Sequence, residues 1–388
     1  MSTLKVDAIV DKDSGNTATI NGQNISASNT QGKNLVINGA MNVAQRGTSS
    51  TTGGYKTVDR MSVGFAGTDE APTITQADVA SGTSPYTNGF RKSLKIQNGN
   101  QTSGAGAADE MALTYSFEAQ DINTSGWDVS STSSNVTLSF WVKSSVAQQF
   151  QVNVRLYGPS DANQREFAFE YTPTGADTWT KVTKTIPGHA SNTIRADNAS
   201  GMFIQFPTFY GTDYTNNARN FDTWEAKNNA QNYKDYVSTW YTTNDATWEI
   251  TGLQLEVGAS ATEFEHRVFI DELRTCSRYF QTMGYNYGDT IGGTDNYNGA
   301  LNGYKMGGEG SGYYGGWQFP VLMRATPTFV IYAVVSGSET AGKLIDFNSG
   351  SDLGSASVAR LTANGWNYIS SGSNSAGAVY RITAEAEL

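Results

Sequence analysis

Two stretches of the chain combine aromatic rings with side chains that can bond hydroxyl groups. The rings that we single out in residues 207–247 and 285–317 are Trp224, Tyr233, Tyr236, Trp240, Tyr285, Tyr287, Tyr297, Tyr313, Tyr314 and Trp317. A flat ring can stack on the C–H face of a sugar, while groups such as Asn228 and Asp235 bond its hydroxyls. Small-ligand sites generally combine apolar walls with a few placed polar groups. These rings are therefore candidate glycan contacts.

The same residues have a second interpretation. Aromatic side chains of β-rich proteins commonly lie in the core, and Tyr and Trp are enriched wherever subunits meet. The glycines among residues 285–317 would also let neighbouring chains approach closely. Core packing, subunit contact and glycan contact all remain open for both stretches.

Residues with the chemistry of an enzyme or a metal centre are few. His189 and His266 are the only histidines, and no Gly-x-Ser-x-Gly elbow accompanies either. The single cysteine, Cys276, excludes an intramolecular disulfide and a cysteine-based zinc site. Glycoside hydrolysis needs only two carboxyl groups about 5–10 Å apart, and the chain has 36 acidic residues. We predict a protein that is not an enzyme and has no cofactor, with a capsule-degrading hydrolase as the open enzymatic alternative.

Composition and charge exclude two classes of binding partner, nucleic acids and membranes. The 388 residues carry a net charge of −10, whereas a nucleic-acid binder needs clustered Lys and Arg. No stretch approaches the roughly 18 apolar residues of a membrane-spanning helix. The opening residues also lack the apolar region of a secretory signal. We therefore expect neither nucleic acid nor membrane insertion, and synthesis in a cytoplasm without export.

The pattern of the chain predicts an all-β protein with three parts. Residues 1–33 contain short alternating segments that cannot be stable alone, which indicates a docking segment. Residues 34–267 contain many strand patterns, the best at 136–143, and predict a jelly-roll β-sandwich. A connecting helix is expected over 268–283, at the start of a C-terminal β-sandwich domain over 268–388.

Several stretches resemble bacteriophage tail-fibre and related virion proteins, especially those of marine and cyanobacterial phages. The strongest similarity lies in Trp248–Gly258, Ala261–Arg267 and Glu272–Phe280. Further similarity lies in Leu4–Ile9, Asn34–Gly47, Thr57–Arg60, Met323–Pro327 and Ala384–Leu388. These stretches follow one another in the order found in such fibres. They are structural motifs and not catalytic ones.

The resemblance implies a jelly roll similar to carbohydrate-binding modules, assembly as a homotrimer, and a C-terminal domain at the receptor-binding tip. It further implies a place in the virion, in the tail or a fibre, with residues 1–33 bound to other tail or virion proteins. The implied function is attachment to host surface polysaccharide. A structural calcium ion is left open, with no ligands assigned. A purely structural virion component, such as a collar, an adaptor or a head fibre, is the alternative.

Overall fold

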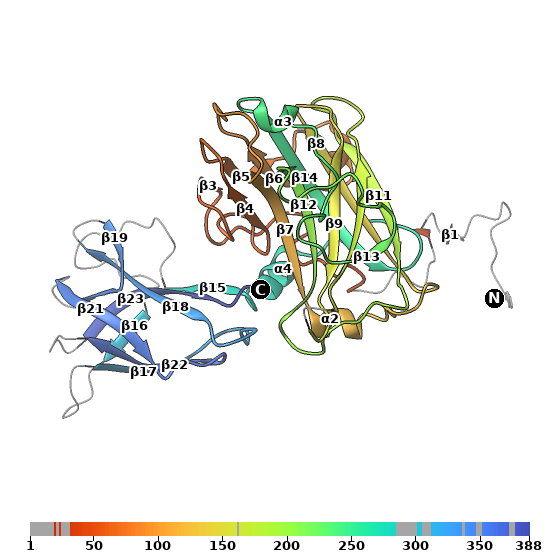
Figure 1. The fold of residues 1–388 in the computed structure, drawn as a ribbon. Helices are drawn as coiled ribbons and strands as arrows, with labels where there is room; N and C mark the ends of the chain where they lie inside the picture. Colours follow the sequence, from red (N-terminus) through yellow and green to blue (C-terminus); the bar gives the residue numbers. More distant parts are fainter. Residues whose placement is uncertain are drawn as a thin grey trace, which may run out of the picture.

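The computed structural model describes residues 19–20, 23–24, 32–160, 163–284, 301–304, 312–335, 338–346, 351–371 and 377–388. It confirms the all-β prediction: antiparallel sheets dominate, and the helices are short (Figure 1). Most of the expected docking segment, residues 1–33, lies outside the described residues, apart from the paired strands β1 (Thr19–Ile20) and β2 (Gln23–Asn24) and residues 32–33.

Two six-stranded antiparallel sheets form the jelly roll. Sheet I has the order β13-β10-β9-β12-β7-β4, and sheet II has the order β11-β8-β14-β6-β5-β3. The strands of sheet I are β4 (Ser62–Ala66), β7 (Glu110–Glu118), β9 (Phe150–Leu156), β10 (Arg165–Tyr171), β12 (Ser200–Tyr210) and β13 (Trp224–Ala226). Those of sheet II are β3 (Ser49–Ser50), β5 (Thr73–Asp78), β6 (Lys92–Gln97), β8 (Asn135–Ser144), β11 (Thr180–Pro187) and β14 (Thr247–Val257). The connections include the short helices α1 (Ser84–Thr87), α2 (Ala119–Thr124) and α3 (Thr239–Thr242).

The core lies between the two sheets and follows from the period-2 alternation of the strands. In β8, Leu138, Phe140 and Val142 are fully buried. Phe140 meets Phe206 of sheet I edge to face, with their ring centroids 5.1 Å apart. The residues between them in β8, such as Trp141, point outward from sheet II. Each sheet therefore has one face in the core and one face available for other contacts.

Residues that carry the resemblance to phage fibres form a partly buried polar network beside the core. The Asn34 side chain accepts a hydrogen bond from the Leu255 amide at 3.1 Å and donates one to the Leu253 carbonyl at 3.2 Å. Its own amide donates to Glu265 at 2.7 Å. Arg267 donates to the Asn34 carbonyl at 2.6 Å. These residues fix the first segment of the jelly roll against β14, so their role here is structural.

The C-terminal β-domain contains one sheet of nine strands. Its strands are β15 (Phe280–Met283), β16 (Leu301–Tyr304), β17 (Gly312–Gln318), β18 (Thr328–Val335), β19 (Ser338–Ala341), β20 (Lys343–Asp346), β21 (Asp352–Ala359), β22 (Gly365–Ser371) and β23 (Gly377–Glu385). The first residues of β23 pair with β16 and β20, and its later residues pair with β15 and β18. Strand β23 therefore joins the two halves of this sheet.

The predicted helix at 268–283 is too long. Helix α4 covers Phe269–Cys276 only, and β15 begins at Phe280. The reason is tertiary: residues 280–283 pair with residues 382–385 of β23. The side chains of Tyr279 and Phe280 are also buried. Pairing and burial override the helical spacing of the sequence.

The C-terminal β-domain returns to the jelly roll through its last residues, as Figure 1 shows by the position of the C-terminus beside α4. Glu387 forms ion pairs with Arg60 and, at 3.1 Å, with Arg46. Arg60 is 1% exposed, and its guanidinium lies 3.5 Å from the centroid of the Tyr279 ring. We call this cluster of Arg46, Arg60, Tyr279 and Glu387 the charged junction.

Candidate functional site

Four of the predicted contact rings are buried within this single chain. Trp224, Tyr233, Trp240 and Tyr313 are between 0% and 7% exposed. The indole of Trp224 donates to the Pro187 carbonyl at 2.7 Å, and that of Trp240 donates to the Thr247 carbonyl at 3.0 Å. A buried ring has no free face for a sugar. The prediction of direct glycan contact is therefore corrected to burial within the chain for these four residues.

The other predicted rings have different surroundings. Tyr236 is half-buried, and its ring packs against Phe209 with centroids 6.3 Å apart. Tyr314 and Trp317 are half-buried on β17, where Tyr314 lies 4.9 Å from the Tyr368 ring. Tyr285, Tyr287 and Tyr297 lie outside the described residues. Within the part of the chain that the structure describes, the predicted rings are thus not brought together into one exposed site.

A cleft of about 450 Å³ lies over the outward face of sheet I, and we call it the tyrosine cleft. It is lined by Glu110, Arg155, Phe203, Gln205, Tyr210, Asp213, Tyr214, Asn229, Ala230 and Asn232. The register of the sheet places Tyr210 opposite Glu110 and Phe203 opposite Arg155. Because side chains alternate along each strand, these residues face outward while Ile204 and Val154 enter the core.

Stacked tyrosines form one wall of the tyrosine cleft. The Tyr210 ring stacks on Tyr233 with centroids 4.6 Å apart, and Tyr214 meets Tyr210 edge to face at 5.4 Å. The buried Tyr233 donates from its hydroxyl to Gln205, which fixes the base of this stack. Tyr210 and Tyr214 are half-buried, so each keeps a part of its ring toward solvent. Tyr233 therefore positions the rings that a ligand could touch.

Charges in the tyrosine cleft are partly compensated. Arg155 donates to the buried Glu166 at 2.7 Å and lies 4.7 Å from the Phe203 ring. Within the described part of the chain, Glu110 and Asp213 form no ion pair with Lys, Arg or His. Burial raises the pKa of the Glu110 carboxyl, and the nearby Glu110 charge raises the pKa of the Tyr214 hydroxyl. The unpaired acids disfavour an acidic ligand.

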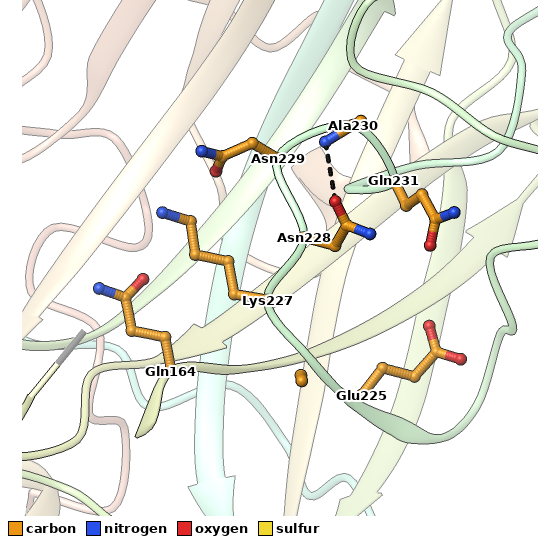
Figure 2. Close-up of a pocket in the computed structure, with 8 residues that line it drawn as sticks. Gln164, Glu225, Lys227, Asn228, Asn229, Ala230 and Gln231 are labelled. Atoms are coloured by element: carbon orange, nitrogen blue, oxygen red, sulfur yellow. Dashed lines mark hydrogen bonds between the residues drawn. The ribbon is translucent and has the colours of Figure 1, made fainter. Parts of the chain in front are cut away.

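A second hollow, of about 740 Å³, adjoins the tyrosine cleft and shares Asn229 and Ala230 with it. Figure 2 shows its side chains around residues 225–231, with the dashed line marking the bond from the Ala230 amide to Asn228 at 3.2 Å. Gln164, Asn228, Asn229 and Gln231 contribute amide groups. The Arg219 guanidinium donates a hydrogen bond to the Glu225 carboxylate at 2.6 Å. This amide hollow extends the polar surface beside the tyrosines.

Sequence reasoning missed most of this site. Tyr210 and Tyr214 belong to the aromatic stretch 207–247, but nothing in the sequence separates them from the buried rings. Glu110 and Arg155 come from distant strands and carry no local pattern. Only the register of β7, β9 and β12 brings them together.

Neither a metal centre nor a membrane span is present in the described regions. No group of three or more His, Cys, Asp or Glu residues within them is arranged to hold a metal ion. No helix formed by the described residues has the length and apolar character needed to cross a membrane.

Comparison of the chain with known proteins gives matches of fold only. No family model matches the sequence, and no curated protein matches it significantly. The enzymatically active domain of tailspike protein 4 of bacteriophage CBA120 is 12% identical over 58% of this chain and 22% of its own, with a TM-score of 0.32. The family 11 carbohydrate-binding module of a Clostridium thermocellum cellulase is 11% identical over 55% of this chain and 96% of its own, with a TM-score of 0.27.

A third similar structure is the N-terminal cellulose-binding domain of β-1,4-glucanase C from Cellulomonas fimi. It is 12% identical over 57% of this chain and 99% of its own, with a TM-score of 0.27. The chain thus spans less than a quarter of the tailspike chain and nearly all of the two modules. At this level of similarity the matches carry no argument about the fold or the activity of this chain.

Proposed function

We propose that this chain is a glycan-binding component of a phage attachment fibre and that the tyrosine cleft is its saccharide site. The observation that carries the proposal is the cleft itself, where partly exposed tyrosines stand beside amide, carboxyl and guanidinium groups. Tyr210 and Tyr214 offer ring faces for the C–H surface of a sugar. Gln205, Asn232 and Glu110 offer donors and acceptors for its hydroxyls.

The charge of the cleft points to a neutral sugar. Glu110 and Asp213 are acids without a basic partner in the described residues, whereas the charge of Arg155 is balanced by Glu166. A uronic acid would therefore meet repulsion. No bond of the sugar is broken in the proposed binding.

The proposed place in a virion rests on the sequence resemblance to tail fibres. A shallow site of this kind binds one sugar chain weakly. Several copies on one particle would raise the overall attachment by ~10²–10⁴-fold through effective concentration. A homotrimer with its 1–33 segments bound to other tail proteins would supply such copies.

Replacement of Tyr214 by alanine tests the site. We expect Tyr214→Ala to weaken binding to neutral surface polysaccharide by about tenfold or more, which corresponds to ~1.4 kcal/mol. Binding is measured on a glycan array and then by calorimetry with a soluble oligosaccharide that the array identifies. The matched control is Tyr332→Ala, which removes a half-buried tyrosine of β18 outside the cleft. Equal affinity of both variants and the wild type would remove the tyrosine cleft from the proposal.

Glycoside hydrolysis is the second candidate, because Glu110 and Asp213 line the same cleft. Hydrolases use two such acids, one of them with a raised pKa, and burial raises the pKa of Glu110. The proposed binding function predicts no new reducing ends when the protein is incubated with a polysaccharide that it binds. Release of reducing ends by the wild type, lost in Glu110→Gln, would replace binding by hydrolysis.

A further inference from the structure

A separate hollow of about 370 Å³ lies on the outward face of sheet II, in the opposite sheet of the jelly roll from the tyrosine cleft. Its floor includes Trp141, Ser139 and Lys181, and its wall includes Glu263, Phe264 and His266. We call it the tryptophan hollow. Its volume falls at the lower end of the range of small-ligand pockets, about 300–1,000 Å³.

The sheet fixes the orientation of Trp141. Its neighbours in β8, Phe140 and Val142, are fully buried in the core, so Trp141 points outward. The register places Lys181 of β11 on one side of Trp141 and Thr251 of β14 on the other. Trp141 is half-buried, which leaves part of its indole toward the hollow.

A cluster of rings builds the wall beside Trp141. The Phe264 ring centroid lies 4.8 Å from that of Phe90 and 4.9 Å from that of His266. A ring nitrogen of His266 also lies 2.9 Å from the Asn88 carbonyl oxygen. Gly252 of β14 lets this cluster approach the sheet, since a Cβ there would lie 2.7 Å from the Phe90 ring. The wall is therefore a packed and fixed structure.

Polar groups with free capacity surround these rings. Lys181 is exposed and forms no ion pair within the described ranges, whereas the neighbouring Lys143 is paired with Glu249 at 2.8 Å. Glu263 is also exposed and lines the hollow. An ammonium donor, a carboxylate acceptor and an outward indole together match a sugar ring: its C–H face lies on the indole, and its hydroxyls reach the charged groups.

We propose that the tryptophan hollow is a second saccharide site, which takes one sugar unit independently of the tyrosine cleft. The proposal rests on the proposed glycan-binding function and extends it. One jelly roll then holds sugar chains on both of its sheets. Each chain of an assembly would contribute two points of attachment instead of one.

The test counts and assigns the sites by calorimetry with soluble gluco-, xylo- and galacto-oligosaccharides. For an oligosaccharide that the wild type binds, we expect two sites in the wild type, and we expect Tyr214→Ala to weaken one of them by about tenfold or more and to leave one remaining at wild-type affinity. Lys181→Ala is expected to weaken the remaining site about tenfold, and Trp141→Ala to abolish it. Lys181 is exposed, so its variant keeps the test valid if Trp141→Ala fails to fold.

Lys95→Ala is the matched control, because Lys95 lies on the outward face of β6 and outside the hollow. It should bind as the wild type does. If Tyr214→Ala loses all binding and the Lys181 and Trp141 variants bind normally, the second site is refuted and the proposed function stands. If only the hollow variants lose binding, the second site stands and the tyrosine cleft falls. Absence of saccharide binding in the wild type would refute both.

Discussion

Asp59 is an acid that the fold holds in an unfavourable environment. Desolvation by burial raises the pKa of its carboxyl to about 6, although the Arg46 charge and hydrogen bonds from Gln45 act in the opposite direction. The Gln45 amide donates to it at 3.0 Å, and Arg46 lies 3.6 Å away. The unfolded chain has the ordinary aspartate pKa of about 3.9. Folding therefore raises the proton affinity of this residue.

This shift predicts how the free energy of unfolding depends on pH. Between about pH 4 and pH 6 the native Asp59 binds more protons than the unfolded one, so its contribution to stability is present at low pH and falls as pH rises. The total change is up to about 3 kcal/mol. We expect the stability difference between wild type and Asp59→Asn, measured by urea unfolding, to change over this window and to be constant above about pH 7. A difference independent of pH would contradict the assignment.

For single residues, the sequence predicts which chemical groups a stretch of the chain supplies. It does not predict which of these side chains are buried. The sequence identifies 207–247 as a stretch of rings and amides, and residues of this stretch line the tyrosine cleft. It cannot separate Tyr214 from Tyr233, because the stretch has no regular period from which an inward and an outward face follow. That separation depends on how the stretch folds over β9 and β12.

Strand β14 contains an irregularity in its pairing with β8. Its pairing with β8 shifts register between Thr251 and Gln254, and Gly252 in this bulge has φ +63°. Glycine adopts this conformation without strain, whereas an L side chain does not. The bulge provides the space in which Phe90 packs against the sheet.

Gly252→Ala should therefore destabilise the jelly roll. The left-handed conformation costs alanine about 1–2 kcal/mol, and displacement of Phe90 adds to this. Gly64→Ala on β4 is the control, because a Cβ at Gly64 meets nothing within 4 Å and its φ is not positive. There we expect unchanged or slightly higher stability, by up to about 1 kcal/mol. Chemical denaturation of both variants measures the difference, and equal midpoints would show that the bulge is not strained.

The sequence predicts whether a segment is a strand or a helix better than it predicts where that strand or helix ends. The alternation in residues 136–143 predicts β8 with its buried face, because the core decides which positions are apolar. The helix expected over 268–283 stops at Cys276, since the later residues find a pairing partner in β23, about 100 positions away in the chain. No local pattern contains that information.

At the scale of the whole molecule, the charged junction fixes the C-terminal β-domain to the jelly roll. Arg278 adds a second contact, with bonds of 2.6 and 2.8 Å to the buried Glu118. Arg324 donates to the Ala386 carbonyl at 2.7 Å and to the Asn198 carbonyl at 2.9 Å. Sequence reasoning left the relation of the two β-domains open, because these partners lie in unrelated segments.

Removal of one buried partner tests the junction. Glu387→Ala leaves Arg60 buried without its acid, and breaking such a pair costs about 3–5 kcal/mol. We expect faster limited proteolysis between the two β-domains and a larger radius of gyration in small-angle scattering. Glu385→Gln is the control: its side chain is 42% exposed and lies 3.6 Å from Arg46, so little change is expected. Identical scattering of the two variants would rule out the junction as the main restraint.

Because the chain leaves the jelly roll through α4 and touches it again at Glu387, the C-terminal β-domain is fastened at both of its ends. Tension applied at the far side of that domain is divided between the covalent connection and the ionic one. Torque applied to the C-terminal β-domain would therefore pass to the jelly roll, whereas a single connection would only swivel.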